Sequence, residues 1–78
     1  MAASPWPKRV HHCAWMISLL VSDRRVDTYW WFEGVIQSGS IGWEVLDLVL
    51  NEDNVRSRLT ELQVVELDEK ITALRYKE

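Results

Sequence analysis

Four consecutive aromatic residues occupy the middle of the chain, at positions 29–32. They belong to the segment 26–37, which is rich in aromatic and β-branched residues, a composition typical of a β-strand. Side chains alternate between the two faces of a strand, so Trp30 and Phe32 would face one way and their two aromatic neighbours the other. A small sheet with one helical layer has one dry and one wet face. We therefore expect the second aromatic face to be covered, either by the chain itself or by another protein.

The segment before this one predicts a second strand. Residues 10–22 place large apolar side chains at alternate positions, as in a strand with one side against a core. The polar residues 22–25 can turn the chain, and residues 37–40 have the composition of a turn. Together these segments predict an antiparallel β-hairpin with residues 22–25 at its tip.

The segment 41–50 supports two interpretations. As a helix, it places Glu44, Asp47 and Asn51 in one polar stripe, because they are spaced by three and four residues. As a strand, it is apolar on most of both faces and would lie at the centre of a sheet. The polar spacing favours the helix.

The remaining residues complete the predicted fold. Residues 55–62 have a helical pattern, so the region 41–62 is expected to hold one or two helices. The Val-rich residues 63–67 and the alternating residues 71–76 predict a closing strand or hairpin, with a helical ending as the alternative. We therefore expect an α+β domain, with helices on one face of a mostly antiparallel sheet.

The length of 78 residues allows one domain, which we assign to residues 10–78. Residues 1–9 contain Pro5 and Pro7 and no periodic pattern, so we expect an extended N-terminal arm. A domain of this size buries only about 60% of the surface that its unfolded chain exposes. Its stability is therefore expected to be small unless a partner or a second copy contributes.

The charge is acidic and unevenly distributed. The net charge is -3, and residues 44–78 hold nine acids and five bases, whereas residues 1–43 hold three acids and four bases. A duplex-binding protein needs a dense basic face, so binding to double-stranded nucleic acid is not expected. The second half of the chain is instead expected to present an acidic surface that attracts a basic partner.

Cysteine content and hydropathy point to the cytoplasm. Cys13 is the single cysteine, which excludes an intramolecular disulfide and favours a reducing compartment. The longest apolar run, residues 14–21, is interrupted by Ser18. A membrane-spanning helix needs about 20 apolar residues, so we expect no membrane association.

No residue pattern demands a particular chemistry. His11, His12 and Cys13 resemble metal ligands, but in a strand only His11 and Cys13 share a face, and no further His or Cys completes a site. The chain contains no P-loop, nucleophile elbow or dinucleotide-binding motif. We therefore expect no catalytic residue, no metal and no cofactor, and a small enzyme or metal-binding protein stays the alternative.

Three groups of residues are candidates for binding a protein partner. Tryptophan and tyrosine supply much of the energy of protein interfaces, arginine fits carboxylates and phosphates, and paired acids attract bases. The candidates are Tyr29, Trp30 and Trp31 of the aromatic run, Arg24 and Arg25 at the hairpin tip, and Glu52 and Asp53 in a polar break.

These features predict a small non-enzymatic protein-binding domain that covers or occludes a site on a larger macromolecule. Phages and mobile elements often encode compact acidic chains of this kind as inhibitors of host machinery, anti-CRISPR proteins among them, and this analogy applies only to the class. The expected partner is a host macromolecular complex, or a second copy in a homodimer. One alternative is a structural subunit of a larger assembly. Another is a single-stranded nucleic-acid binder that stacks bases on Trp30 and Trp31 beside the two arginines.

Overall fold

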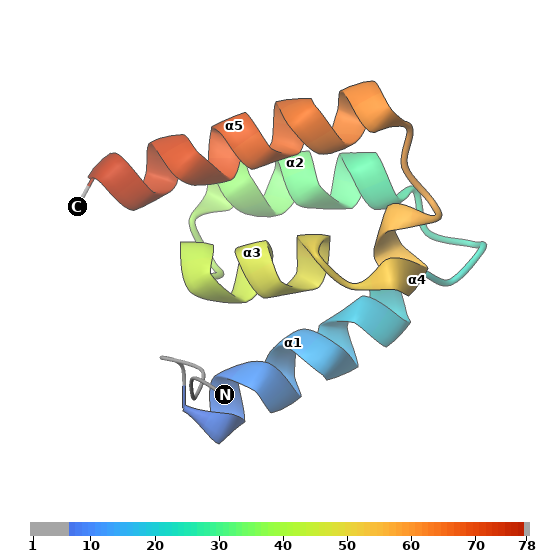
Figure 1. The fold of residues 1–78 in the computed structure, drawn as a ribbon, viewed down its shortest axis with the longest axis horizontal. Helices are drawn as coiled ribbons and strands as arrows, with labels where there is room; N and C mark the ends of the chain where they lie inside the picture. Colours follow the sequence, from blue (N-terminus) through green and yellow to red (C-terminus); the bar gives the residue numbers. More distant parts are fainter. Residues whose placement is uncertain (1–6, 78) are drawn as a thin grey trace, which may run out of the picture.

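Five helices follow one another along residues 7–77, the part of the chain that the computed structural model describes (Figure 1). In chain order they are α1 (Lys8–Val21), α2 (Thr28–Ser38), α3 (Trp43–Leu50), α4 (Asp53–Arg56) and α5 (Glu61–Lys77). The predicted α+β fold is wrong, because these residues contain no β-strand. The two expected hairpin segments, 10–22 and 26–37, fall largely on α1 and α2. The expected closing strands, 63–67 and 71–76, lie within α5.

Asp27 and Gly39 determine where α2 begins and ends. Oδ1 of Asp27 accepts a hydrogen bond of 3.1 Å from the backbone N–H of Trp30, which caps the start of the helix. Gly39 has a φ of 67°, in the left-handed region that favours glycine, and its N–H donates to the carbonyl of Val35 at 3.0 Å. These caps outweigh the β propensity of the aromatic run, so its side chains are distributed around a helix.

The alternation of large apolar side chains predicts a strand over residues 10–22, but a segment that is apolar at most positions fits both a period of two and a period of 3.6. The helical spacing is the one that the tertiary packing uses. Ala14, Ser18 and Val21 are spaced by four and three residues and are all buried. They form the inner side of α1.

The expected N-terminal arm over residues 1–9 overlaps the start of α1. Lys8 and Arg9 form the first turn of the helix, and the carbonyl of Pro7 accepts a hydrogen bond of 3.0 Å from the N–H three residues later. Proline suits the start of a helix, because the N–H that it lacks has no partner there. Residues 1–6 of the expected arm lie outside the described part of the chain.

A capping box begins α5. The N–H of Gln63 donates to Oγ1 of Thr60 at 3.1 Å, and the N–H of Thr60 donates to Oε1 of Gln63 at 3.0 Å. Leu67 and Ile71, four residues apart, are buried on one side of the helix. The helical ending that the sequence left open is therefore the one that the structure adopts.

Residues 43–50 are helical, as their polar spacing favours, and the strand alternative is wrong. The helical pattern over 55–62 does not form one helix, because residues 57–60 form a turn between α4 and α5. The hydroxyl of Ser57 donates to the carbonyl of Asn54 at 2.9 Å. Local bonds of this kind compete with helix continuation.

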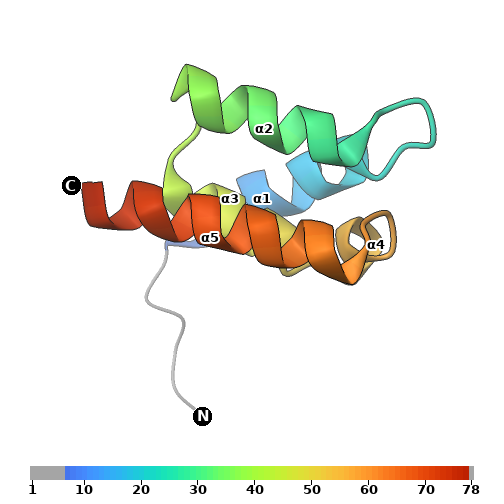
Figure 2. The same ribbon diagram turned by 90° about the horizontal axis from the view of Figure 1, so that it is seen from above.

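The helices pack with α3 between α1 and α5 (Figure 1). A second view shows α2 alongside α5 and α4 at one end of the bundle, where it contacts α1 and α3 (Figure 2). Of the described helices, none has the length and apolarity needed to cross a membrane. The buried apolar side chains come from all five helices: Ala14, Val21, Phe32, Leu46, Val49, Leu50, Val55, Leu67 and Ile71.

Two polar contacts set the register between α2 and α5. The hydroxyl of Tyr29 donates a hydrogen bond of 2.7 Å to Oε2 of Glu66. One turn further along both helices, Nζ of Lys70 donates to Oε2 of Glu33 at 2.6 Å. Because each contact joins residues 37 positions apart, the two helices run parallel.

Candidate protein-binding surfaces

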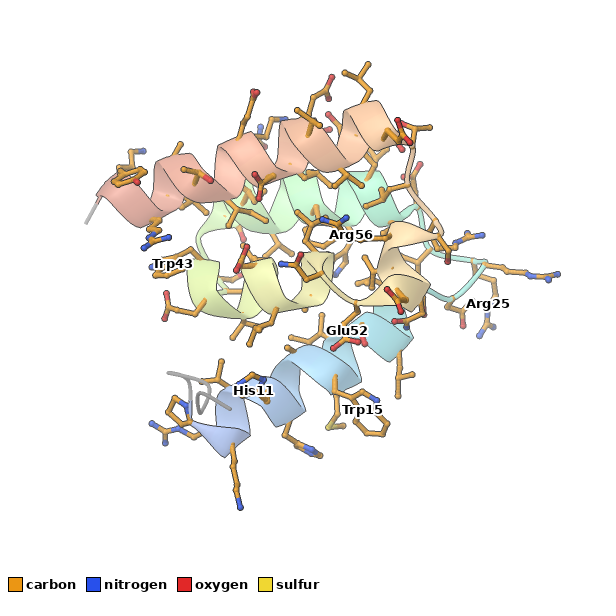
Figure 3. All side chains as sticks on the ribbon, in the orientation of Figure 1. His11, Trp15, Arg25, Trp43, Glu52 and Arg56 are labelled. Atoms are coloured by element: carbon orange, nitrogen blue, oxygen red, sulfur yellow. The ribbon has the colours of Figure 1, made fainter. Side chains whose placement is uncertain are left out.

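The outer side of α1 is apolar and exposed. Its four large apolar side chains are each between 51% and 60% accessible to solvent. Figure 3 shows Trp15 pointing away from α3. The spacing of these residues places them on one side of the helix. We call this surface the α1 face, and it consists of Trp15, Met16, Leu19 and Leu20.

Small residues on the opposite side of α1 explain why the large ones lie outside. Ala14 and Ser18 are each 1% exposed, and small side chains let neighbouring helices approach closely. Nδ2 of Asn54 in α4 donates to the carbonyl of Ser18 at 3.2 Å and to the hydroxyl of Ser22 at 3.0 Å. These contacts hold α1 in one orientation and direct the α1 face outward.

Basic residues flank the α1 face at both ends. Lys8 and Arg9 lie in the first turn of α1, which contains no acidic residue. Arg24 and Arg25 follow the last turn, and Arg25 pairs with Asp23 at 3.2 Å. The hydrogen bonds from Arg25 hold the pKa of the Asp23 carboxyl below its ordinary value. The α1 face is therefore an apolar surface with basic side chains at each end.

The four aromatic residues at 29–32 do not share one surface. Phe32 is fully buried, and the ring of Trp31 packs edge-on against it with ring centres 5.0 Å apart. Tyr29 is half-buried, and its hydrogen bond to the carboxylate on α5 raises the pKa of the phenol. Trp30 is 72% exposed. Of the three aromatic residues predicted to bind a partner, Trp30 is thus the one that is mostly open to solvent.

The predicted arginine pair lies beside the N-terminal end of α2. Arg24 and Arg25 are exposed, and Figure 3 shows Arg25 projecting from its loop. They line a pocket of about 470 Å³ together with Arg58, whose Nη2 donates to the carbonyl of Arg24 at 3.4 Å. Sequence reasoning missed Arg58 because it lies 34 residues from Arg24.

The predicted acidic pair lies at the start of α4. Glu52 occupies the N-cap position and is half-buried, whereas Asp53 is the first helical residue and is exposed. The seven predicted binding residues therefore come from three elements: α2, the loop at 22–27 and the start of α4.

The metal-ligand-like residues His11, His12 and Cys13 are exposed on the first half of α1. Over residues 7–77, no three or more His, Cys, Asp or Glu side chains are placed to hold a metal ion. The ring of His12 instead lies beside that of Trp15, with ring centres 6.1 Å apart.

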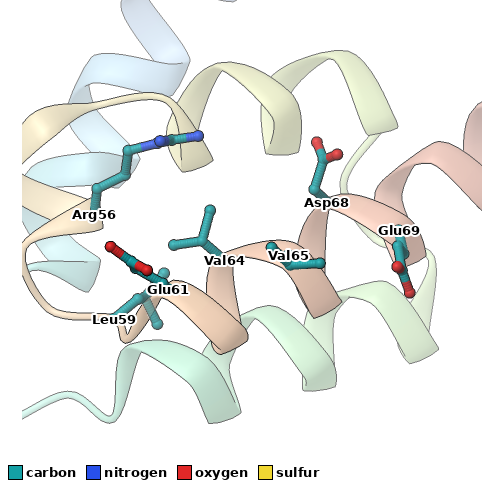
Figure 4. Close-up of a pocket in the computed structure, with 7 residues that line it drawn as sticks. All are labelled: Arg56, Leu59, Glu61, Val64, Val65, Asp68 and Glu69. Carbon is teal, nitrogen blue, oxygen red and sulfur yellow. The ribbon is translucent and has the colours of Figure 1, made fainter.

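A groove with acidic edges runs along α5 and has a volume of about 660 Å³ (Figure 4). Val64 and Val65 lie in its middle, with Glu61 at one end and Asp68 and Glu69 at the other. We call it the α4–α5 groove, and it is lined by Arg56, Leu59, Glu61, Val64, Val65, Asp68 and Glu69.

Sequence reasoning missed both surfaces because it assigned strands to α1 and α5. A strand over 10–22 would turn Trp15 and Leu19 toward the core, on the same side as Ile17 and Val21. The signal that the sequence offered is a difference in side-chain size between the two sides of residues 10–22 when they are treated as a helix. The small residues lie on one side of α1, and the large ones lie on the other.

No protein-family model, no curated protein and no solved structure matches this chain.

Proposed function

We propose that this chain is a non-enzymatic protein-binding domain that covers a site on a larger macromolecule, and that it binds through the α1 face. The observation that carries this function is the exposure of four large apolar side chains on one side of one helix. Contiguous apolar patches on a small monomeric protein mark interaction sites, and tryptophan and methionine are enriched in interfaces. The second half of α1 is mostly apolar on its inner and its outer side, a pattern that is typical of a helix buried on all sides.

A different protein suits the α1 face better than a second copy does. In an antiparallel pair of α1 helices, Lys8 of one copy lies near Arg24 and Arg25 of the other. In a parallel pair, the same basic ends meet. Like charges oppose both arrangements. We assign the partner an apolar surface with carboxylates at its ends, because this chemistry complements both the apolar centre and the basic ends of the α1 face.

The geometry supports insertion of α1 into a groove of the partner. The helix has 14 residues and is thus about 21 Å long at about 1.5 Å per residue. Its exposed side chains recur at the spacing by which amphipathic helices anchor in apolar grooves. The size and acidic composition of the chain support a specific version of this function. In it, the protein is an inhibitor from a phage or mobile element that acts in the cytoplasm by occluding host machinery.

A photo-crosslinking experiment tests this function. Met16 in the α1 face is replaced by p-benzoylphenylalanine, and the matched control replaces Gln37, an exposed residue of α2. Extracts of the organism that carries the gene are irradiated, and the crosslinked protein is purified and its attachment site is mapped. We expect one partner to attach at position 16, at an apolar surface beside carboxylates. Attachment from position 37 alone, or at a basic surface of the partner, would overturn the proposal.

A further inference from the structure

The α4–α5 groove has an apolar floor that is open to solvent. Val65 is 53% exposed, and Leu59 and Val64 are partly accessible beside it. Covering apolar surface of this kind is favourable for any partner that fits it. The groove is lined by residues of α4, of the turn that follows it and of α5, which pack on the core.

Carboxylates outnumber cations along the edges of this groove. Glu61, Asp68 and Glu69 are exposed, and none of them pairs with a cation among residues 7–77. The cation beside them is Arg56, whose Nε donates to the carbonyl of Leu50 at 3.2 Å. That contact engages the guanidinium at the C-terminal end of α3 and leaves the carboxylates available to a partner.

Asp47 on α3 adds a further negative charge near the groove. Burial raises the pKa of the Asp47 carboxyl, the charge of Asp68 raises it further, and Arg75 opposes both effects. Two carboxylates that repel each other are stabilised when a cation lies beside them. The surroundings of Asp68 therefore favour an incoming positive charge.

We propose that the α4–α5 groove is a second binding surface, which takes a lysine- or arginine-bearing amphipathic segment of a protein partner. The apolar side chains of the segment cover Val64 and Val65, and its cations lie beside Asp68 and Glu69. This inference goes beyond the function assigned to the α1 face. Because α3 lies between α1 and α5, the two surfaces can be tested independently (Figure 1).

The charge of the groove decides between possible occupants. Nucleic acid is disfavoured, because its phosphates would meet carboxylates. The basic, apolar α1 of a second copy fits the charge, but such a head-to-tail contact adds copies to a ring or an open chain, and it would use the α1 face that we assign to another partner. We therefore assign the groove to a segment of a different protein.

A peptide titration followed by NMR tests this assignment. The probe is a synthetic 14-residue helical peptide that carries leucine on one side and lysine on the other, and its control carries glutamate in place of each lysine. The protein is the ¹⁵N-labelled full chain. The variants are Asp68→Asn/Glu69→Gln and the matched control Glu52→Gln/Asp53→Asn, which removes the same charge outside the groove.

We expect the lysine peptide to shift the amide signals of residues 61–69 and the glutamate peptide to leave them unchanged. Losing two contacts at exposed carboxylates should weaken binding about fivefold in Asp68→Asn/Glu69→Gln, and higher salt should weaken it further. The control double variant should bind as the parent chain does.

Four results would overturn the proposal. The first is an equal loss of peptide affinity in both double variants, and the second is a change of amide signals confined to residues 12–20 of α1. The third is equal binding of the lysine and glutamate peptides. The fourth is a solution mass of the protein that falls when Asp68 and Glu69 are changed. The last result would assign the groove to a second copy. Because the α1 face is tested with different variants, failure here leaves the function proposed for that surface standing.

Discussion

The hydroxyl of Thr28 donates a hydrogen bond of 2.7 Å to the carbonyl oxygen of Val21, and both residues are buried. Val21 ends α1, where the last carbonyls lack partners within the helix. Thr28 begins α2, so this bond joins two helices at the point where the sequence suggested a hairpin turn. It also joins the two ends of the loop that carries Arg24 and Arg25.

Removing this hydrogen bond should destabilise the fold. In Thr28→Val the carbonyl of Val21 stays buried without its donor, which costs about 1–3 kcal/mol of unfolding free energy. Thr28→Ser keeps the hydroxyl and should lose much less. Urea unfolding followed by circular dichroism measures both variants. Equal stability of Thr28→Val and the parent chain would show that the bond contributes nothing.

Polar substitutions on the α1 face should leave stability nearly unchanged. Leu19→Gln and Leu20→Gln alter side chains that are already more than half exposed, so each should change the unfolding free energy by about 0.5 kcal/mol or less. Leu46→Ala, at a fully buried position, should cost about 2–5 kcal/mol. Thermal unfolding compares the stabilities of Leu19→Gln, Leu20→Gln and Leu46→Ala. If Leu19→Gln is as damaging as Leu46→Ala, the α1 face is part of the core.

Asp47→Asn should stabilise the protein slightly at neutral pH. Burial and then Asp68 raise the pKa of the Asp47 carboxyl, so the folded chain holds this proton more tightly than the unfolded chain does. The contribution of Asp47 to stability therefore falls as the pH rises from the ordinary carboxyl value of 3.8 through the raised value. Above that range, the variant should gain no more than about 0.5 kcal/mol.

The gain should disappear in acid, where Asp47 is protonated in both states. Chemical unfolding at pH 3 and pH 7 gives the difference in unfolding free energy between Asp47→Asn and the parent chain at each pH. Glu44→Gln on the same helix is the matched control. A loss of stability in Asp47→Asn at pH 7 would contradict this assignment of charge repulsion.

The chain should be monomeric in the absence of its partner, because like charges oppose the pairing of two α1 faces and because we assign the α4–α5 groove to a different protein. Light scattering over a concentration series should give a mass near 9.2 kDa throughout. A mass that doubles with concentration in the parent chain, but not in Leu19→Gln, would instead assign the α1 face to a homodimer.

Polar residues and helix caps were the reliable signals in the sequence. The spacing of Glu44, Asp47 and Asn51 favours the helix that residues 43–50 form. Asp27 and Gly39 bracket α2, but the strand prediction for residues 26–37 followed the β propensity of the aromatic run and did not use these caps. For α1, whose residues fit both a strand and a helix pattern, tertiary packing decided in favour of the helix.

The candidate surfaces depended on the correct secondary structure. Once 10–22 is a helix, the small residues Ala14 and Ser18 indicate its inner side, and the α1 face follows. The α4–α5 groove could not be predicted in this way. It requires that the turn after α4 place Leu59 beside Val64 and Val65, and this placement depends on how α4 and α5 pack.

The affinity of the purified partner for Trp15→Ala and Trp30→Ala tests the role of the α1 face most directly. Both residues are exposed tryptophans, but only Trp15 lies on the α1 face. Truncating a tryptophan at the centre of an interface costs about 2 kcal/mol or more, so Trp15→Ala should weaken binding by at least about tenfold. Trp30→Ala should bind as the parent chain does. Unchanged affinity of a folded Trp15→Ala, with a loss in Trp30→Ala, would contradict this assignment and would place the interface on α2.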